Sequence, residues 1–440
     1  GKAGATMASG AVHALQQHGV APVGGVIVVA ARPAPNATVE EGGALPHTLE
    51  VRVGDHPVPD LGSLAAADVI ARKVQDVQPG DTALVLISGG ATSLCAAPCA
   101  ELREFCGHAI NAHTLITDLA ASLHAAGLAI HEMNAIRRRL LRWGAGRLAL
   151  ALGARGAASI PVFAVSDVIG DDPSVIGSGP CSPDPIDEAE FFAMLDAYNL
   201  RVTLPNELAV ALGFAGDVRH VIVPPAANDA AFKLVTYAIV ARNLDALNAM
   251  RDAARALHID VITVVPTPLM GEAETVGHAI ASIALRAAAS SAREQLIIWG
   301  GEPTVSMNDT ARIFSRDDDD RLLDVHANEV PNGGRMQALA LAAALALEQA
   351  ALSVNTANAE RVTLLAAGTD GRDGPTDACG AIIDSHTPAG VRRNGRDPVQ
   401  DLHRFRSYPA LNAANALLKT GSTGTNVMDV VAVHIRPGTA

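Results

Sequence analysis

A glycine-rich loop that carries three aspartates is the first segment whose residue types predict chemistry. The sequence AGTDGRDGPTDACG, residues 367–380, follows an apolar run at 362–366 and contains Asp370, Asp373 and Asp377. Calcium loops of the EF-hand type need acidic or amide ligands at alternate positions, which this spacing does not provide. Mg²⁺ instead takes one or two protein carboxylates and shares water and the phosphates of a substrate. We therefore expect Asp370, which is nearest the strand end, to bind a metal or a substrate, while Asp373 and Asp377 either join it or cap turns.

Three further apolar runs end in small and polar residues, as this one does. Ser88, Gly89 and Gly90 follow residues 83–87, Ser166 and Asp167 follow 162–165, and Gly300, Gly301 and Glu302 follow 296–299. A single cluster of this kind is explained by a tight turn between a strand and a helix. Four clusters favour one binding site, because ligands of open parallel sheets bind beyond the carboxyl ends of the strands and glycine lets backbone amides approach phosphate oxygens. The expected contacts to substrate or nucleotide are Ser88, Gly89, Gly90, Gly301, Glu302, Thr369, Asp370, Gly371 and Asp373, with Asp167 as a second candidate metal ligand.

Cations for an anionic substrate stand at the starts of two expected helices. Lys2 precedes a helical pattern, and a lysine there opposes the helix dipole unless an anion binds at the same end; the alternative is an exposed terminal lysine. Arg335 follows two glycines and precedes a strongly apolar helix, and its fork can grip a carboxylate or a phosphate. In the arginine-rich segment NAIRRRLLRWGAGRL, we expect Asn134 and Arg137 to lie near the site and the other arginines to be surface charges.

Several common catalytic motifs are absent from the sequence. There is no GxxxxGK[ST] loop for a nucleotide, no GxGxxG fingerprint for a dinucleotide and no GxSxG nucleophile elbow. His56 and His113 are interpreted as ordinary histidines rather than general bases. A nucleotide, if bound, must therefore be held by a different arrangement of glycine loops.

The elements that would position these residues alternate between strands and helices. Short β-branched runs are expected as strands at 25–30, 83–87, 162–165, 221–223, 261–265, 296–299 and 362–366. Helical spacing of apolar residues lies between them, for example after Ser63, which is expected to be an N-cap. This pattern predicts an α/β fold with parallel sheet content. We place a domain boundary near Ala292, giving domains 1–291 and 292–440, and interpret the run 317–320 as a solvated turn or a metal site.

Composition excludes several classes of function. The chain has 440 residues, of which 49% are hydrophobic, and a formal net charge of −13, which argues against a nucleic-acid or membrane-surface protein. The five cysteines form no CxxC pair, so we expect reduced thiols and a cytoplasmic protein. The longest apolar run, around 338–347, is too short for a membrane span, and no signal peptide opens the sequence.

Together these residues carry a resemblance to the class II glycerate kinases. The similar segments are GKAGATMA (1–8), GDHPVPD (54–60), LISGGATSL (86–94), NAIRRRL (134–140), SDVIGDDPSVIGSGPCSPDP (166–185), GGEPTV (300–305), GGRMQALAL (333–341), AGTDGRDGPTDACGAIID (367–384) and TGSTGTNVMD (420–429). The resemblance implies phosphorylation of D-glycerate at its 2-hydroxyl by ATP with Mg²⁺ or another divalent cation. It also implies a Rossmann-like N-terminal α/β domain, a smaller C-terminal α/β domain and an active site in the cleft between them, with functional roles for Lys2, Asp167 and Arg335.

The sequence departs from the family pattern at identifiable positions. Family members carry a further stretch before Gly-Lys-Ala, whereas this sequence starts at Gly1. The family's Lys-Gly-Gly-Arg has Gly144 in place of the lysine, and its Gly-Arg-Asn-Gln has Met336 in place of the asparagine. We expect the changes at Gly144 and Met336 to alter the affinity for substrate or the choice of substrate.

The expected reaction is in-line transfer of the γ-phosphoryl group of ATP to glycerate, a chemistry that depends mainly on positioning and on charge neutralisation. Two alternatives remain at this point. One is a hydroxypyruvate reductase, which the missing dinucleotide fingerprint does not support, and the other is a non-catalytic sensor that binds a sugar acid or a nucleotide. The expected partners are small molecules, with the oligomeric state left open and a homo-oligomer among the options.

Overall fold

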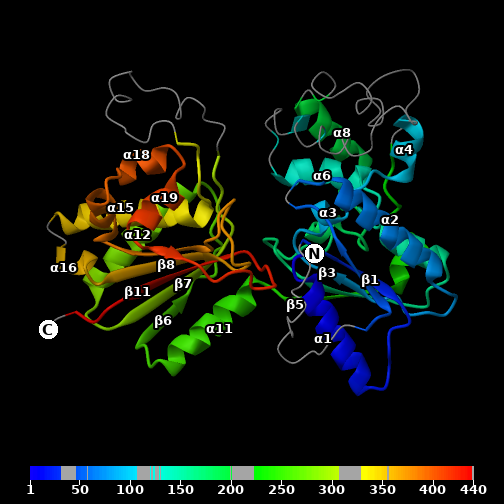
Figure 1. The fold of residues 1–440 in the computed structure, drawn as a ribbon, viewed down its shortest axis with the longest axis horizontal. Coiled ribbons are helices and arrows are strands. Elements are labelled where there is room, and N and C mark those ends of the chain that lie inside the picture. The colour runs from blue at the N-terminus through cyan, green and yellow to red at the C-terminus, as the bar shows by residue number, and fades with distance from the viewer. Residues whose placement is uncertain are drawn as a thin grey trace. The chain divides into compact units, whose positions relative to one another are not determined.

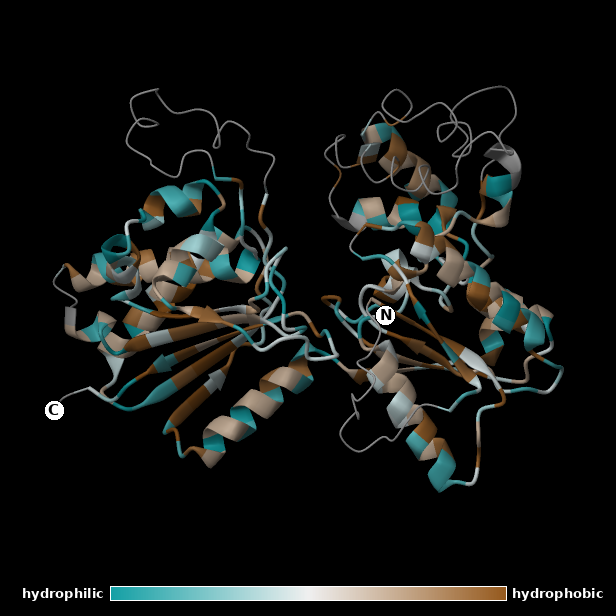
Figure 2. Cartoon of the chain, viewed as in Figure 1, coloured by the Kyte–Doolittle hydropathy of each residue, from teal (hydrophilic) through white to brown (hydrophobic). Residues whose placement is uncertain are grey.

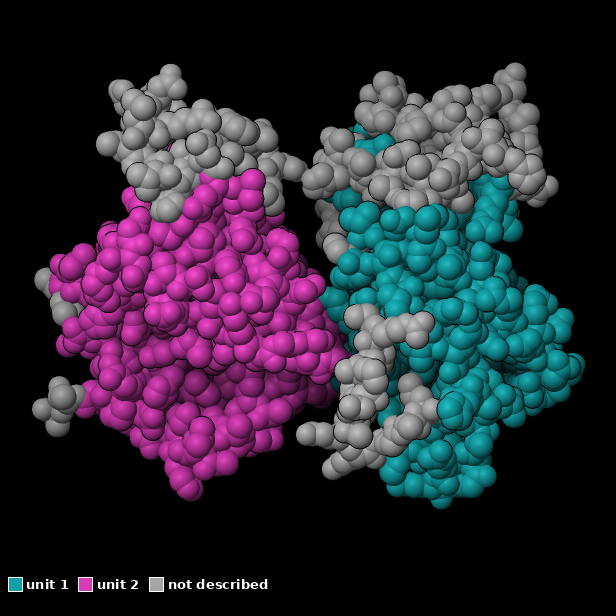
Figure 3. All heavy atoms as spheres, viewed as in Figure 1, with its two compact units in different colours: residues 1–241 teal, residues 242–440 magenta. Residues whose placement is uncertain are grey.

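The protein folds into two compact units, residues 1–241 and 242–440 (Figure 3). The structure is a computed structural model that describes residues 1–30, 46–56, 58–106, 119, 122–123, 128, 130–198, 200, 222–306, 329–353 and 356–438. The boundary between the units lies earlier than the one placed at 291/292 from the sequence, because the helices and the strand of residues 243–290 pack with the second unit. The run 317–320 and His113 lie outside the described residues.

Both sheets of the first unit are parallel. One pairs β1 (Gly25–Val29) with β2 (Leu49–Val53), and the other has the order β3 (Val85–Ile87), β4 (Ile160–Val165), β5 (Val235–Ala241). The expected parallel content of the N-terminal part is thus confirmed. Residues 222 and 223, expected in a strand, lie outside any strand. Since β3 and β4 run in the same direction, the residues that follow them meet at one edge.

Helices surround these sheets. They are α1 (Gly4–Gln17), α2 (Leu61–Asp76), α3 (Ala91–Leu94), α4 (Ala100–Cys106), α6 (Ile130–Leu140), α7 (Arg147–Ala154) and α8 (Glu188–Ala197), with two short 3₁₀ helices, η2 (Ile176–Ser178) and η3 (Ala230–Leu234). A core of apolar side chains from α2, α7 and β4 includes Ala67, Leu152 and Ile160.

The N-cap expected at Ser63 is wrong. Helix α2 begins two residues earlier, and the side chain of Asp60 accepts a hydrogen bond from the backbone N–H of Leu61. Ser63 is instead buried, and its hydroxyl accepts the backbone N–H of Asp55 at 3.0 Å while its own N–H donates to the Asp55 carboxylate at 2.9 Å. The Asp55 segment is fastened to α2 in this way.

The second unit contains one mixed sheet of six strands. Its order is β10 (Leu417–Leu418), β9 (Gly380–Asp384), β8 (Val362–Gly368), β11 (Asp429–Ile435), β7 (Gln295–Gly301), β6 (Val261–Val264). Among these described strands, β6 and β7 pair in parallel and the other neighbouring pairs are antiparallel. The sheet is mixed because β11 inserts between β7 and β8 and runs antiparallel to both of them.

Helices cover both faces of this sheet. Helix α11 (Asn243–Ala256) lies along β6 and β7 on one side, and α12 (Ala273–Ser290) with α15 (Arg335–Ala351) lies on the other (Figure 1). The strands between them are largely hydrophobic (Figure 2). The described residues of this unit also form four shorter helices: α16 (Thr356–Ala359), α17 (Thr387–Arg393), α18 (Pro398–His403) and α19 (Ser407–Ala413).

Helices α12 and α15 approach each other closely at a glycine. An ideal Cβ built on Gly277 of α12 would lie 2.3 Å from the carbonyl oxygen of Leu339 in α15. A residue without a side chain thus lets the two backbones come into contact at this point. The many alanines of α15 keep the side chains small along the rest of the helix. No helix of the described residues has the length and hydropathy of a membrane span.

Candidate active site

The loop after β3 holds the segment that contains Lys2. The backbone N–H of Lys2 donates to the carbonyl oxygen of Gly89 at 2.8 Å, and the N–H of Ala3 donates to the hydroxyl oxygen of Ser88 at 3.0 Å. The Lys2 side chain runs past Gly90, because an ideal Cβ built on Gly90 would lie 3.4 Å from Cγ of Lys2. Gly90 has φ of +79°, which favours glycine. The structure therefore brings Lys2 together with Ser88, Gly89 and Gly90.

His56 also lies at this loop. An ideal Cβ on Gly90 would be 3.0 Å from His56 Cδ2 and 3.2 Å from Nε2, and the His56 side chain is exposed. His56 thus lies beside Lys2, and its interpretation as an ordinary histidine stays a prediction. The sequence feature that points to His56 is the segment GDHPVPD, which is one of the segments similar to the class II glycerate kinases but shows no helical or strand pattern.

Asp167 stands at the neighbouring strand end. It follows β4, which pairs in parallel with β3, and it is half-buried. The loops after the two strands also meet further on, where the hydroxyls of Thr92 and Ser178 lie 2.8 Å apart. Asp167 and Lys2 thus share the carboxyl edge of the three-stranded sheet.

Asn134 and Arg137 lie one turn apart on α6. Arg137 Nη1 donates to Asn134 Oδ1 at 3.5 Å, and Arg137 Nε is buried with no hydrogen-bond partner among the described residues. Burial lowers the pKa of the Arg137 guanidinium. A half-buried arginine with an unused donor is suited to an anion that is not part of the chain.

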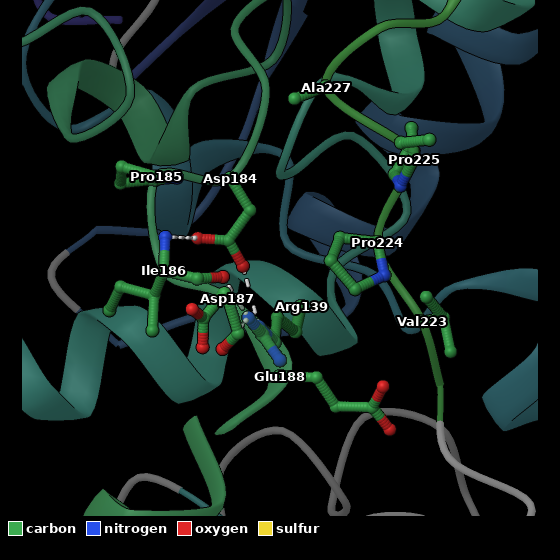
Figure 4. A pocket seen from close by; sticks show the side chains of 11 residues that line it. Arg139, Asp184, Pro185, Ile186, Asp187, Glu188, Val223, Pro224, Pro225 and Ala227 are labelled. Atoms are coloured by element: carbon green, nitrogen blue, oxygen red, sulfur yellow. Dashed lines mark hydrogen bonds and ion pairs between the residues drawn. The ribbon is translucent and has the colours of Figure 1, made fainter. Parts of the chain in front are cut away.

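The neighbouring Arg138 and Arg139 are not the surface charges expected from the sequence, because both are buried in ion pairs. Arg138 and Arg139, both buried, bind the carboxylate of Asp184, with Arg139 Nε 2.5 Å from Asp184 Oδ2. Arg139 lines a cavity of about 330 Å³, together with residues 184–188 and 223–227 (Figure 4). None of the residues expected to bind substrate or nucleotide lines this cavity.

In the second unit, three carboxylates gather at one edge of the mixed sheet. Strand β11 runs antiparallel to β7 and β8, so its first residue, Asp429, lies opposite both Gly301 and Gly368. Glu302 follows β7, and Asp370 follows β8 soon after Gly368. The strand ends that the sequence singled out are therefore adjacent here, with Asp429 between them.

Arg335 binds two of these carboxylates. Its Nε and Nη2 donate to the two oxygens of Asp429 at 2.5 and 3.2 Å, and its Nη1 lies 3.1 Å from Glu302 Oε1. Burial lowers the pKa of the Arg335 guanidinium, but the charges of Asp429 and Glu302 more than offset this and raise it. Burial raises the pKa of Asp429 to about 6, although Arg335 acts in the opposite direction. An anion that reaches Arg335 must compete with the more exposed partner, Glu302.

Asp373 holds the N-terminus of α15. Its two carboxylate oxygens accept the backbone N–H groups of Met336 and Gln337 at 3.2 and 2.8 Å, and the side chain is buried. Burial raises the pKa of Asp373 to about 7, and these two hydrogen bonds only partly oppose the shift. An ideal Cβ on Gly334 would lie 2.2 Å from Asp373 Oδ1, so glycine is required before Arg335. Asp373 thus supports Arg335 in the structure, and direct contact with a ligand stays a prediction.

The remaining loop residues are tied to the segment before β11. Thr369 Oγ1 donates to the carbonyl oxygen of Met428 at 2.6 Å and accepts the N–H of Val427 at 2.8 Å. Gly371 has φ of +83°, and its ideal Cβ would lie 1.8 Å from the carbonyl oxygen of Gly421. The loops at 369–374 and 420–428 therefore form one layer of backbone at the sheet edge.

This edge offers a divalent cation two carboxylates, those of Asp370 and Asp429, rather than a full set of protein ligands. Within the described ranges, no group of three His, Cys, Asp or Glu side chains is arranged to hold a metal ion. Asp370 and Asp429 both approach Gly368, whose ideal Cβ would lie 3.4 Å from one oxygen of each. Mg²⁺ needs only one or two protein carboxylates when phosphates and water complete its shell.

Comparison with known proteins identifies the family. Residues 1–213 match the model of a domain of unknown function (DUF4147), and residues 295–429 match the MOFRL family. The chain is 31% identical to a D-glycerate 2-kinase of Thermotoga maritima over 87% of this chain and 79% of that protein. The chain belongs to the glycerate 2-kinase family. The resemblance seen in the sequence is thereby confirmed.

Two further relatives of this glycerate 2-kinase family member are informative. A crystal structure of a glycerate kinase from Thermotoga maritima superimposes with a TM-score of 0.69 at 28% identity, covering 99% of this chain and 89% of that one. A protein of Agrobacterium vitis with a provisional name as a hydroxypyruvate reductase is 32% identical over 88% of this chain and 77% of its own length.

The glycerate 2-kinase family member thus has two groups of candidate residues, one in each unit. Lys2, the loop after β3 and Asp167 form the first group. Arg335, Glu302 and the loop at 369–373 form the second. The residue that sequence reasoning missed in the second group is Asp429, although it ends the segment TGSTGTNVMD of the resemblance. The roles of all of these residues stay predictions.

Proposed function

We propose that the protein transfers the γ-phosphoryl group of ATP to the 2-hydroxyl of D-glycerate, giving 2-phosphoglycerate and ADP. The observation that carries the proposal is the similarity to the D-glycerate 2-kinase of Thermotoga maritima over most of both chains. The geometry supports it, because glycine loops and cations lie at the strand ends of both units, as the transfer of a charged group requires.

The proposed step is an in-line displacement at phosphorus. The C2 oxygen of glycerate forms a bond to the γ-phosphorus while the bond from that phosphorus to the bridging oxygen of ADP breaks. Asp167 accepts the proton of the hydroxyl in this proposal, and the alternative role for Asp167 is to hold the metal. ADP leaves with the charge of the broken bond, so neutralisation of that charge lowers the barrier.

Four polar side chains serve the anions in the proposal. Lys2 and Arg335 balance the charges of the glycerate carboxylate and the transferring phosphoryl group. Arg137, with its unused Nε, and Asn134 add donors from α6. The glycine loops at 89–90 and 371–374 present backbone N–H groups to the phosphates of ATP.

The proposed reaction also uses a magnesium ion. Asp370 would hold Mg²⁺, with Asp167 as the alternative ligand. When bound, the ion neutralises phosphate oxygens and orients the γ-phosphoryl group.

The proposal is tested with purified protein, D-glycerate, ATP and Mg²⁺ in an assay that couples ADP release to absorbance. Arg335→Ala and Asp167→Asn should each reduce kcat/KM by about 100-fold or more, because each removes a group that acts on the reacting centre. Matched controls are Arg293→Ala and Asp252→Asn, which change exposed residues. Normal turnover in either of the first two variants would contradict the assigned role, and absence of glycerate-dependent ADP release in the wild type would contradict the function.

The name of the Agrobacterium vitis relative favours one rival, reduction of hydroxypyruvate. That reaction needs a dinucleotide, and the sequence lacks the GxGxxG fingerprint of the usual dinucleotide fold. Oxidation of NADH in the presence of hydroxypyruvate, without ATP, would favour the rival over the kinase.

A further inference from the structure

The segment that leads into Arg335 is held by the turn between α18 and α19. The backbone N–H of Asn332 donates to the carbonyl oxygen of Phe405 at 2.8 Å, and the N–H of Tyr408 donates to the carbonyl oxygen of Asn332 at 3.1 Å. An ideal Cβ on Gly333 would lie 2.1 Å from the hydroxyl oxygen of Ser407. The two segments are therefore in direct backbone contact immediately before Arg335.

A buried ion cluster fixes this turn. Asp401 and Arg406 are each 1% exposed, and Arg406 Nε lies 2.9 Å from Asp401 Oδ1. Arg396 Nε lies 2.6 Å from Asp401 Oδ2, and the same arginine reaches Glu329 at 2.8 Å. Buried ion pairs add little net stability, because the cost of desolvation offsets their attraction. Such a cluster can instead hold the turn between α18 and α19 in one conformation. The turn is thus a rigid support.

Tyr408 extends this support to the aspartate loop. Its hydroxyl donates to Asp377 Oδ1 at 2.7 Å, and Lys419 Nζ donates to the other oxygen of Asp377 at 2.9 Å. Asp377 belongs to the loop whose Asp373 caps α15. Tyr408 therefore connects the two segments that flank Arg335, one through its backbone N–H and the other through its hydroxyl. Because Asp377 and Lys419 are exposed, these contacts contribute little to global stability.

We propose that Tyr408 is a positioning residue for Arg335, which it serves by linking the segment at 332–334 to the aspartate loop. This inference rests on the proposed function of Arg335 in phosphoryl transfer. Loss of the hydroxyl leaves the aromatic ring and the backbone hydrogen bond in place. It removes the hydrogen bond that the hydroxyl donates to Asp377 and the one that it accepts from Lys419 Nζ at 3.0 Å, so it loosens the link to the aspartate loop. The guanidinium of Arg335 then samples more orientations, and the rate falls because transfer depends on placement.

The kinetic test uses Tyr408→Phe. The kcat should fall about fivefold, the size of effect expected when one hydrogen bond that fixes geometry is lost, while the midpoint of thermal unfolding stays at the wild-type value. In an Arg335→Lys background, which lacks the fork, Tyr408→Phe should cause no further loss. The matched control is Tyr198→Phe in the first unit. Wild-type kcat in Tyr408→Phe, a loss that is undiminished in the Arg335→Lys background, or a loss that parallels the unfolding temperature would each overturn the proposal.

A second readout separates this inference from the proposed function. The Nε–H resonance of Arg335 is identified in arginine-labelled protein by its disappearance in Arg335→Lys. Tyr408→Phe should shift or broaden that resonance, whereas Tyr198→Phe should leave it unchanged. If the wild type does not phosphorylate glycerate but the resonance responds, the function fails and the positioning role stands. An unchanged resonance in Tyr408→Phe overturns the positioning role whether or not the wild type is active.

Discussion

The buried carboxylate of Asp373 makes the stability of the second unit depend on pH. Burial raises its pKa from the ordinary value of 3.8 to about 7, so the folded protein binds a proton more tightly than the unfolded chain does. A raised pKa of this kind stabilises the fold below pH 4, and the stabilisation is lost as the pH rises through 7. The stability of the second unit should therefore decrease from pH 5 to pH 8.

The size of the decrease follows from the shift. With about 1.4 kcal/mol for each unit of pKa, the Asp373 contribution to the free energy of unfolding should fall by about 2.5–3 kcal/mol between pH 5 and pH 8. Asp373→Asn removes this titration. Because an amide nitrogen cannot accept the second backbone N–H of α15, the variant also loses about 1 kcal/mol at every pH. The difference in slope, rather than the absolute stability, is the diagnostic quantity.

Urea unfolding measured by tryptophan fluorescence checks the slope. The chain has two tryptophans, Trp143 in the first unit and Trp299 in the second, so a Trp143→Phe background lets Trp299 report the second unit alone. The matched control is Asp377→Asn, which changes an exposed aspartate of the same loop whose pKa is lowered by hydrogen bonds from Lys419 and Tyr408. The reasoning is refuted if Asp373→Asn and Asp377→Asn have the same pH dependence between pH 5 and pH 8.

Three further predictions concern charge pairing and backbone contact. Arg335→Met and Asp429→Asn, combined in a double-mutant cycle of urea unfolding, should give a coupling energy of about 1–3 kcal/mol. This energy is smaller than that of a fully buried pair because Arg335 is partly exposed, and additive effects of the two substitutions would contradict the pairing. Gly277→Ala should destabilise the second unit by about 2 kcal/mol or more, since its Cβ would meet the backbone of α15, whereas Gly10→Ala, with open space around it in α1, should stabilise its helix by about 0.5–1 kcal/mol; thermal unfolding that shows equal changes for the two would contradict the close packing. Gly371→Ala, at a positive φ and against a carbonyl oxygen, should raise KM for ATP by about tenfold or more with an unchanged KM for glycerate; equal rises in both KM values would argue against a phosphate-binding role for that loop.

Local patterns predicted much of the candidate site. The glycines after β3 and the aspartate after β4 are recognisable because each directly follows an apolar run. Arg335 is recognisable because two glycines precede it and an apolar helix follows it. These features depend on neighbouring residues, and the structure places each of them at a strand end or a helix start, as expected.

Features that depend on long-range pairing could not be predicted in this way. Asp429 reaches Arg335 only because β11 inserts between β7 and β8, and nothing near residue 429 indicates that pairing. Strand β6 belongs to the second unit because it pairs with β7, and its own short β-branched sequence does not indicate which strand it pairs with. The capping role of Asp373 likewise requires knowledge of which helix lies beside its loop.

The product of the reaction tests the central claim most directly. Phosphorus NMR of a mixture of wild-type protein, D-glycerate, ATP and Mg²⁺, recorded with proton coupling, distinguishes the two possible monophosphates of glycerate. Transfer to the 2-hydroxyl gives a phosphorus that couples to the single proton on C2, so the account predicts a new doublet together with ADP. A triplet, which reports the two protons on C3, or the absence of any new phosphate ester would contradict it.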